Sequence, residues 1–269
     1  MNGPEQYDRP LAVADGVYWV GFHEEQTNFH CNPYLVLAGD EAVLIDGGSR
    51  PDFAVVMMKI LQTGIAPSRI AALIYQHYDP DLCGSVSNIA EMIGTSNLKI
   101  LAHSLDILFI KYYLEKEHHR FLTPIEGQDR SFDFQGRRLE FFDTPFAHNA
   151  GSFVTYDPRT KTLFSSDLFG SISREWELYL DLASECYDCN GNTPCPLGRA
   201  SCPLLDLDAF HRKIMPSGKA LAYAMSVMAP LEIDLIAPQH GSLIADRRAI
   251  AFLMDRLANL DRVGIDAYL

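Results

Sequence analysis

Short apolar runs alternate along the chain with longer stretches in which apolar residues recur every three or four positions. The short runs predict β-strands in the first part of the chain, at 16–22, 33–39, 41–48, 70–76 and 98–103. A tight turn at Gly39-Asp40 joins the second of these strands to the third. The run IAALIYQ at 70–76 is apolar almost throughout, which is typical of a strand that is buried on both faces.

The longer stretches predict helices, at 51–64, 85–93, 104–117 and 246–260. Pro51 stands near the start of the first helix and Gly64 just past its end, and Ser104 is the expected cap of the third. Further strand-like runs follow within 121–157, at 161–170 and at 232–241, with a helical or irregular region before the last of them. Because strands and helices are mixed in two rough halves, the pattern favours two sheets covered by helices over one doubly wound sheet.

Length and composition fit one large domain. The 269 residues, 48% of them hydrophobic, are enough for a sizeable core, and we expect a single domain over 1–269 with a cysteine-rich insertion at about 180–204. We find neither a membrane span nor a secretory signal, so we expect a cytoplasmic protein. The formal net charge of −13 argues against nucleic acid or an anionic membrane as a partner.

Candidate chemistry is concentrated where predicted strands end. The segment HYDPDLCGS, directly after the buried strand at 70–76, holds His77, Asp79 and Asp81 at alternate positions. Three later strand ends carry the same residue types: His148, Asp167 and His240. Loops at one edge of a rigid sheet are where binding groups concentrate, so we expect these six side chains to form one site.

Imidazole and carboxylate ligands suit iron, zinc or manganese. Six protein ligands exceed what one tetrahedral zinc takes, and a carboxylate has two oxygens with which to bridge two cations, so two metal ions fit better than one. Taken singly, each residue has an ordinary structural explanation, such as a core histidine, a turn former or a helix cap. Their repetition at strand ends favours the metal site.

Four cysteines, Cys186, Cys189, Cys195 and Cys202, fall within one short stretch with the spacing C-x2-C-x5-C-x6-C. Four thiolates hold zinc tetrahedrally or an iron–sulfur cluster, and a cytoplasmic setting favours metal over disulfides. The spacing matches no standard ferredoxin or zinc-ribbon pattern. We predict a zinc or 4Fe-4S site here, with buried free thiols, or disulfides if the protein is exported, as the alternatives.

The order of these motifs resembles the metallo-β-lactamase superfamily. VLIDGG with Asp46 is similar to its early strand-end aspartate, and HYDPDLCGS to its H-x-[HED]-x-D-x-x-G loop. The resemblance covers nearly the whole chain and implies an αββα sandwich, in which two mixed β-sheets are flanked by helices.

Within that superfamily the chain resembles flavodiiron proteins and the oxygen-binding di-iron domains related to them. The segments YWVGFHEE (18–25), FHCNPYLV (29–36), FSSDLFG (164–170) and LIAPQHG (235–241) carry this likeness, together with the acidic residue Asp79. The resemblance implies two iron ions: one held by His77, Asp79 and His148, the other by Asp81 and His240, with Asp167 bridging them. His30 resembles a pocket histidine that faces bound gas, and we take His30 and Tyr78 as candidate catalytic side chains.

The chain differs from this family at two positions, and it shows no likeness to one of the family's domains. Asp79 stands where the family usually has Glu, and Leu82 where it usually has His. The second iron would therefore have one protein ligand fewer, which leaves it more open or more weakly bound. No segment resembles the flavin-carrying flavodoxin domain.

Three functions remain open from the sequence. The first is a di-iron protein that binds O2 or NO and reduces it where an electron-donor protein resupplies electrons. The second is a hydrolase that uses a metal-bound hydroxide on an ester, thioester or phosphodiester. The third is a sensor read by a signalling partner. The family resemblance favours the first function and a homodimer, and an iron–sulfur cluster at the cysteine quartet would stand in for the missing flavin.

Overall fold

A computed structural model describes residues 7–23, 30–173, 175–189, 191 and 195–269. The first sheet has seven strands, which lie side by side in chain order: β1 (Leu11–Ala14), β2 (Val17–Trp19), β3 (Tyr34–Ala38), β4 (Glu41–Ile45), β5 (Ile70–Ile74), β6 (Lys99–Ala102) and β7 (Leu122–Pro124). Its first four strands are antiparallel, and β4 to β7 run parallel. Because β4, β5 and β6 are parallel neighbours, their carboxyl ends meet at one edge of the sheet.

The second sheet has five strands in the order β12-β11-β10-β9-β8, which are β8 (Ser131–Phe134), β9 (Arg137–Asp143), β10 (Phe153–Asp157), β11 (Thr162–Phe164) and β12 (Leu235–Ala237). Its strands pair antiparallel, except that β11 and β12 are parallel. The two mixed sheets predicted from the sequence are thus confirmed.

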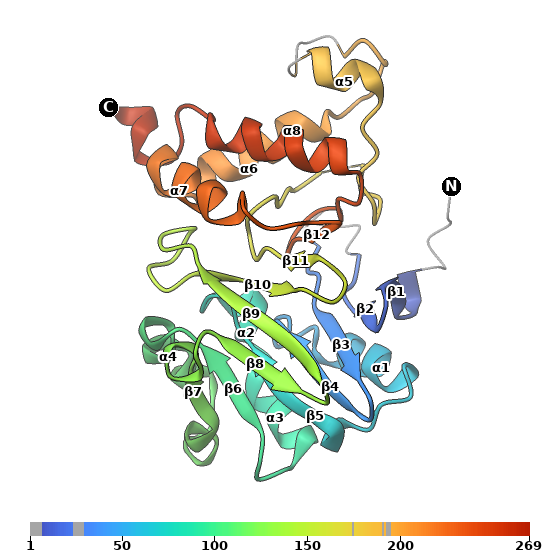
Figure 1. Cartoon of the computed structure of the whole chain (residues 1–269), viewed down its shortest axis with the longest axis vertical. Helices are drawn as coiled ribbons and strands as arrows, with labels where there is room; N and C mark the ends of the chain where they lie inside the picture. Colours follow the sequence, from blue (N-terminus) through green and yellow to red (C-terminus); the bar gives the residue numbers. More distant parts are fainter. Residues whose placement is uncertain (1–6, 24–29, 174, 190, 192–194) are drawn as a thin grey trace.

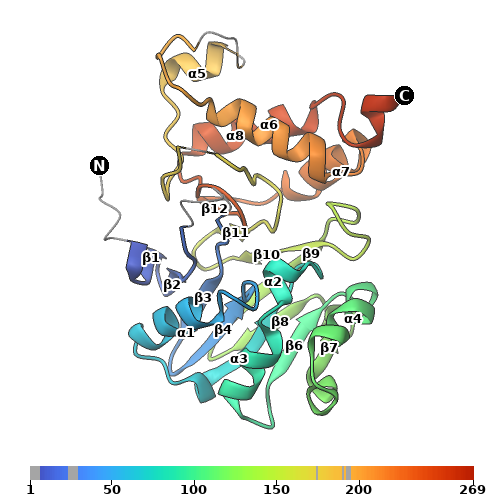
Figure 2. The same ribbon diagram turned by 180° about the vertical axis from the view of Figure 1, so that it is seen from behind.

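Helices cover the outer face of each sheet (Figure 1 and, from behind, Figure 2). The first sheet is covered by α1 (Phe53–Gln62), α3 (Val86–Ile93) and α4 (Ser104–Ile110), and the second by α6 (Pro203–Ile214), α7 (Gly218–Met228) and α8 (Arg247–Ala258). Two short α-helices, α2 (Pro80–Cys83) and α5 (Ser184–Cys189), lie in loops. Short 3₁₀-helices lie at η2 (Pro67–Arg69), η3 (Lys111–Tyr113), η4 (Lys116–Phe121), η5 (Ile125–Gln128) and η6 (Ile265–Tyr268).

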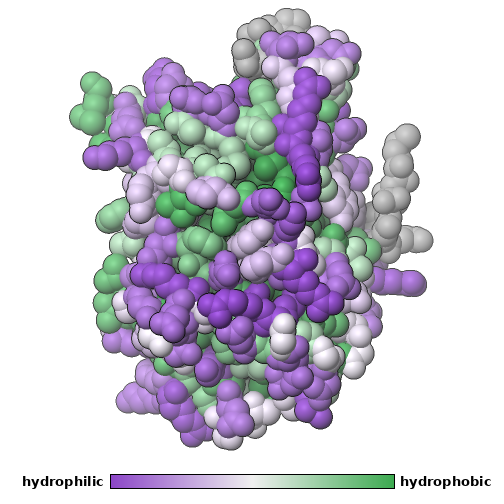
Figure 3. Space-filling model, in the orientation of Figure 1, coloured by the Kyte–Doolittle hydropathy of each residue, from purple (hydrophilic) through white to green (hydrophobic). Residues whose placement is uncertain are grey.

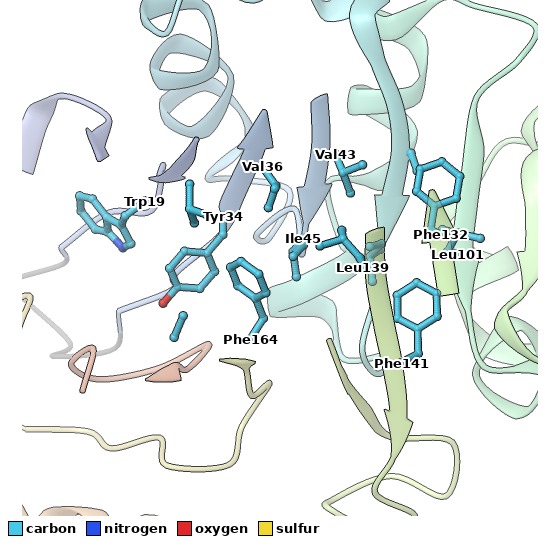
Figure 4. Close-up of a cluster of buried hydrophobic side chains, with 14 of the residues drawn as sticks. Trp19, Tyr34, Val36, Val43, Ile45, Leu101, Phe132, Leu139, Phe141 and Phe164 are labelled. Atoms are coloured by element: carbon cyan, nitrogen blue, oxygen red, sulfur yellow. The ribbon is translucent and has the colours of Figure 1, made fainter. Parts of the chain in front are cut away.

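Alternation along the strands explains why both faces of each sheet are apolar. On β3, Tyr34 and Val36 point into the space between the sheets, whereas Leu35 points to the helices outside. Figure 4 shows the residues of the first sheet meeting those of the second across this space, among them Val36, Val43, Ile45, Leu139, Phe141 and Phe164. Helical layers on both outer faces are what permit such continuously apolar strands as β5.

The helix predicted at 104–117 is shorter and differently capped than the sequence indicates. It ends at Ile110, and its cap is His103, whose ring accepts a hydrogen bond from the Leu105 amide. The Ser104 hydroxyl instead donates to the carboxylate of Glu126, 2.6 Å away. The prediction of Ser104 as the cap was wrong because a long-range carboxylate, which local sequence cannot indicate, takes its side chain.

Polar side chains cover much of the face in Figure 3, with smaller hydrophobic areas between them. Across the part of the chain that the structure describes, no helix combines the length and the apolar character needed to cross a bilayer.

The buried guanidinium of Arg137 links the two sheets. The Arg137 guanidinium on β9 donates to the carboxylate of Asp157 on β10, and both side chains are fully buried. The same guanidinium donates to the Leu37 carbonyl of the first sheet, with an N–O distance of 2.8 Å. One buried cation therefore satisfies acceptors from both sheets.

We predict that Arg137→Leu lowers the free energy of unfolding by about 3–5 kcal/mol, because it leaves Asp157 buried without its cation. The exposed pair between Arg138 and Asp133 gives a matched control, and Arg138→Ala is expected to cost about 1 kcal/mol or less. Urea unfolding at neutral pH measures both values. Equal losses in the two variants would contradict the linking role of Arg137.

Candidate metal centre

Loops at the carboxyl ends of four strands, β5, β9, β11 and β12, bring the six predicted ligands together. His77, Asp79 and Asp81 follow β5, and the connection from β9 to β10 supplies His148. Asp167 follows β11 and His240 follows β12. Three overlapping groups of ligand atoms, each within 4.8 Å of one another, link these side chains into one cluster. The site thus lies where the edges of both sheets meet.

One half of the cluster contains two imidazoles and two carboxylates. His148 Nε2 lies 2.9 Å from Asp167 Oδ2 and 3.5 Å from Asp79 Oδ2. His77 Nε2 lies 3.9 Å from the same Asp167 oxygen, too far for a hydrogen bond. These donors are nitrogen and oxygen only, as iron, zinc or manganese prefers.

The other half contains His240 and Asp81, with His240 Nε2 lying 3.0 Å from Asp81 Oδ2. The second oxygen of Asp167, Oδ1, lies 3.6 Å from His240 Nε2. Asp167 therefore turns one oxygen toward each half of the cluster. This is the arrangement expected of a carboxylate that bridges two cations.

Two buried atoms in the cluster fit a cation better than they fit the protein alone. His77 Nε2 and Asp167 Oδ1 have no hydrogen-bond partner among the described residues, although both are inaccessible to solvent. Buried polar atoms are nearly always satisfied, and such exceptions are common where an ion binds. The residues present thus fit a two-metal centre.

The charges of the cluster support the same conclusion. Burial by itself would raise the pKa of Asp167, but the imidazoles of His77, His148 and His240 outweigh burial and hold the pKa below its ordinary value. Burial likewise opposes charge on His240, yet the Asp81 carboxylate and the Cys31 thiol raise the pKa of His240 well above its ordinary value. Bound cations would supply the positive charge that protonated imidazoles otherwise bring to these carboxylates.

Neighbouring groups orient the ligands, and sequence reasoning missed them. His77 Nδ1 lies 2.8 Å from the Ser166 hydroxyl, and His240 Nδ1 donates to the His30 carbonyl at 2.8 Å. Both contacts leave Nε2 directed into the cluster, as is usual for metal-binding histidines. The Asn149 amide donates to Asp79 Oδ1 at 3.0 Å and so fixes this carboxylate, whose side chain is shorter than that of the Glu usual in the family. In the sequence, the only indication of the role of Asn149 is that it directly follows His148.

Asp46 supports the site without joining its ligand groups. Its carboxylate accepts hydrogen bonds from the backbone and the side-chain amide of Gln76. The Gln76 side-chain oxygen in turn accepts from the Thr155 amide on β10, 2.9 Å away. Burial raises the pKa of Asp46 to about 7. The residue directly before His77 therefore connects the end of β4 to the second sheet.

His30 lies beside the second half of the cluster. Its ring packs against His23 and Trp176, with centroid distances of 4.5 and 4.7 Å, and burial lowers its pKa to about 3. His23 and Trp176 also line a surface cavity of about 530 Å³. His30 thus contacts two residues that line this cavity and, through its backbone carbonyl, His240. Its place in a gas pocket and its catalytic role stay predictions.

Tyr78 stacks on Phe109 with a centroid distance of 4.4 Å, and its catalytic role also stays a prediction. Leu82 is fully buried against apolar neighbours and offers no ligand, as the sequence indicates.

The four clustered cysteines lie apart from this centre. Cys186 and Cys189 are on α5, and Cys186 and Cys202 contact the apolar cluster beneath α6 and α8. Among the residues described, no metal-type group of three ligand atoms includes any of the four. All four are free thiols. Their predicted metal therefore has no support from the arrangement.

Comparisons with known proteins agree with the fold. A family model described as ODP family beta lactamase matches residues 29–241. Among curated proteins, the type A flavoprotein fprA of Rhodobacter capsulatus is 26% identical over 255 residues, covering 91% of this chain and 54% of that protein. This chain thus spans about half the length of that relative.

Two solved structures share the architecture. One, described as the peroxy diiron species of chemotaxis sensor ODP, superposes with a TM-score of 0.72 at 22% identity, covering 96% of this chain and 97% of that one. The other, a flavodiiron protein from Giardia intestinalis, superposes with a TM-score of 0.72 at 18% identity, covering 93% and 59%.

Because the family model matches most of the chain, this protein belongs to the ODP family of β-lactamase-like proteins. The αββα sandwich and the resemblance to flavodiiron proteins are both confirmed.

A buried histidine outside the cluster holds the Asp167 loop in place. His211 Nε2 accepts a hydrogen bond from the Phe169 amide at 3.0 Å, and Nδ1 donates to the Leu207 carbonyl at 2.8 Å. Burial lowers the pKa of His211 to about 4. The neutral ring is therefore the form that the fold requires.

We predict a stability loss in mild acid that depends on His211. The unfolded imidazole takes up a proton near pH 6.5 and the folded one near pH 4, so this contribution is complete above pH 6.5 and is lost as the pH falls toward 4. Between pH 7.5 and 5 it amounts to about 2 kcal/mol. Urea unfolding at both pH values should show this difference between the natural chain and His211→Gln, which keeps one donor and one acceptor. An identical pH dependence in both would contradict the assignment.

Proposed function

We propose that this protein is a di-iron protein that binds O2 or NO, and that it reduces the gas where a partner resupplies electrons. The observation that carries the proposal is the cluster itself, with its two halves joined by the buried Asp167 carboxylate. Two ferrous ions, when bound, would supply the electrons and the open coordination positions for a diatomic gas. The nitrogen and oxygen donors accommodate iron in both of its common oxidation states.

We assign each ligand to one or both of the two ions. His77, Asp79 and His148 would hold the first ion, Asp81 and His240 the second, and Asp167 both. Asn149, Ser166 and the His30 carbonyl keep the ligands aligned, so that little reorganisation accompanies a change of charge.

His30 and two neighbouring rings connect the second half of the cluster with a surface cavity. The backbone carbonyl of His30 contacts His240, and its imidazole packs against His23 and Trp176, which line the cavity of about 530 Å³. Burial keeps His30 neutral at physiological pH, so the side chain can accept or donate a hydrogen bond at that wall. We propose that His30 is the side chain that meets the gas.

The outcome of gas binding depends on the supply of electrons. With an electron-donor protein the bound gas is reduced, O2 to water or NO to nitrous oxide. Without an electron donor the gas stays bound as a stable adduct, which a signalling partner recognises. The solved structure described as a chemotaxis sensor, which this chain matches over nearly its whole length, supports the sensor function.

We predict that the protein, purified anaerobically and loaded with two equivalents of Fe(II), develops a new visible absorption band on exposure to O2 or NO. Asp167→Ala should bind about one equivalent of iron or less and give no band, because the carboxylate that joins the two halves is gone. Iron analysis and absorption spectroscopy measure both effects.

Asp133→Ala is the matched control for this experiment. It also removes one carboxylate, but from an exposed ion pair on β8, and it should bind iron and change colour as the natural chain does. A natural chain that holds two iron ions and shows no spectral change with either gas would sink the proposal.

The metal predicted at the cysteine quartet remains a separate proposal. If Cys186, Cys189, Cys195 and Cys202 hold a 4Fe-4S cluster, the protein as isolated should contain acid-labile sulfide, and Cys186→Ser together with Cys189→Ser should remove it. Zinc without sulfide in the natural chain would indicate a structural site. Neither metal bound would leave the four residues as free thiols.

A further inference from the structure

A thiol lies in the second half of the metal centre. The sulfur of Cys31 forms a group with the Asp81 carboxylate and the His240 imidazole, in which the ligand atoms all lie within 4.8 Å of one another. Cys31 itself is buried. Atoms bound to one ion at about 2.0–2.3 Å lie at most about 4.6 Å apart, so the group reaches a shared ion with small adjustments.

The second half of the centre needs such a donor. The residue after Asp81 is Leu82, which packs among apolar side chains and offers no ligand. Asp81, His240 and one oxygen of Asp167 would otherwise be the whole protein contribution on this side. Adding the Cys31 sulfur gives four donors, the number that a tetrahedral ion requires.

A hydrogen bond between Cys31 and His240 does not by itself account for the arrangement. The Nδ1 atom of His240 donates to the His30 carbonyl, so Nε2 faces the cluster. This nitrogen carries at most one proton, yet the Asp81 carboxylate, the Cys31 sulfur and Asp167 Oδ1 all surround it. Asp167 Oδ1 is buried and accepts no hydrogen bond within the described part of the chain. A cation would satisfy all four atoms.

The backbone holds Cys31 and His240 in a fixed relation. The Phe22 amide donates to the Cys31 carbonyl at 3.2 Å, and the Asn32 amide donates to the Gln239 carbonyl at 2.8 Å. The Asn32 side chain donates to the Gly241 carbonyl at 2.9 Å and accepts from the Trp19 indole at 2.8 Å. Gly21 allows the close approach, since a Cβ there would lie 2.3 Å from the Cys31 carbonyl oxygen. The thiol is therefore preorganised beside the imidazole.

We propose that Cys31, as a thiolate, is a ligand of the second metal ion. This inference rests on the proposed two-metal centre and adds a sulfur donor to it. On binding, the thiol releases its proton to solvent and a sulfur–metal bond forms, with no change of oxidation state. The two ions then differ in kind, because the first has nitrogen and oxygen donors only and the second has a soft sulfur donor as well.

Cobalt(II) gives a test that does not depend on activity. A thiolate bound to cobalt(II) produces an intense near-ultraviolet charge-transfer band, which nitrogen and oxygen ligands do not produce. The full chain is titrated with cobalt(II) after Cys186, Cys189, Cys195 and Cys202 are changed to Ser, so that other clustered thiols do not contribute. The band should grow with one of the two equivalents bound. In Cys31→Ser the band should be absent, and the dissociation constant of the cobalt ion in the second half of the centre should rise at least roughly tenfold.

Cys83→Ser is the matched control. This thiol is also buried near the centre, but it donates to the Tyr78 and Asp79 carbonyls, which a hydroxyl can do as well. The band should survive in this variant. Two cobalt ions bound without the band, or a band unchanged in Cys31→Ser, would overturn the role of Cys31 while leaving the two-metal centre intact. Failure to bind any cobalt or iron would overturn the centre itself.

Discussion

The interaction on which this structure depends is the placement of one carboxylate, Asp167, among three imidazoles at the junction of two sheets. The carboxylate is almost fully buried and directs one oxygen to His148 and the other toward His240. A charge so deeply buried is costly unless opposite charge surrounds it. Every other feature of the site can be understood as a way of bringing compensating groups to this position and of keeping them there.

The fold performs that task through a few buried polar links rather than through the apolar core alone. Gln76 joins the end of β4 to β10, and Asn32 joins the start of β3 to the His240 loop. Each of these side chains uses several of its hydrogen-bonding atoms, so the two sheets cannot slide without breaking more than one contact. The apolar layer between the sheets supplies the stability, and these amides supply the register of the site.

The two halves of the centre differ in their donors. Asp79 is short and needs Asn149 to orient it, Leu82 contributes no ligand, and the Cys31 sulfur stands beside Asp81 and His240. A soft donor on one ion and hard donors on the other would give the pair unequal affinities and unequal redox behaviour. A centre of that kind suits a protein in which one ion binds gas while the other tunes the electrons.

The sequence by itself predicted two sheets covered by helices and the six side chains that gather in the cluster, because strand periodicity and residue type at strand ends are local signals. It also indicated that Leu82 leaves a ligand missing. What it could not determine were contacts between residues far apart in the chain, such as Glu126 taking the Ser104 hydroxyl or His211 holding the loop at Phe169. Only the tertiary structure decided that Cys31, for which the sequence predicted no role, lies beside His240. The physical reason is that its neighbour Asn32 pairs with a segment some 200 residues away.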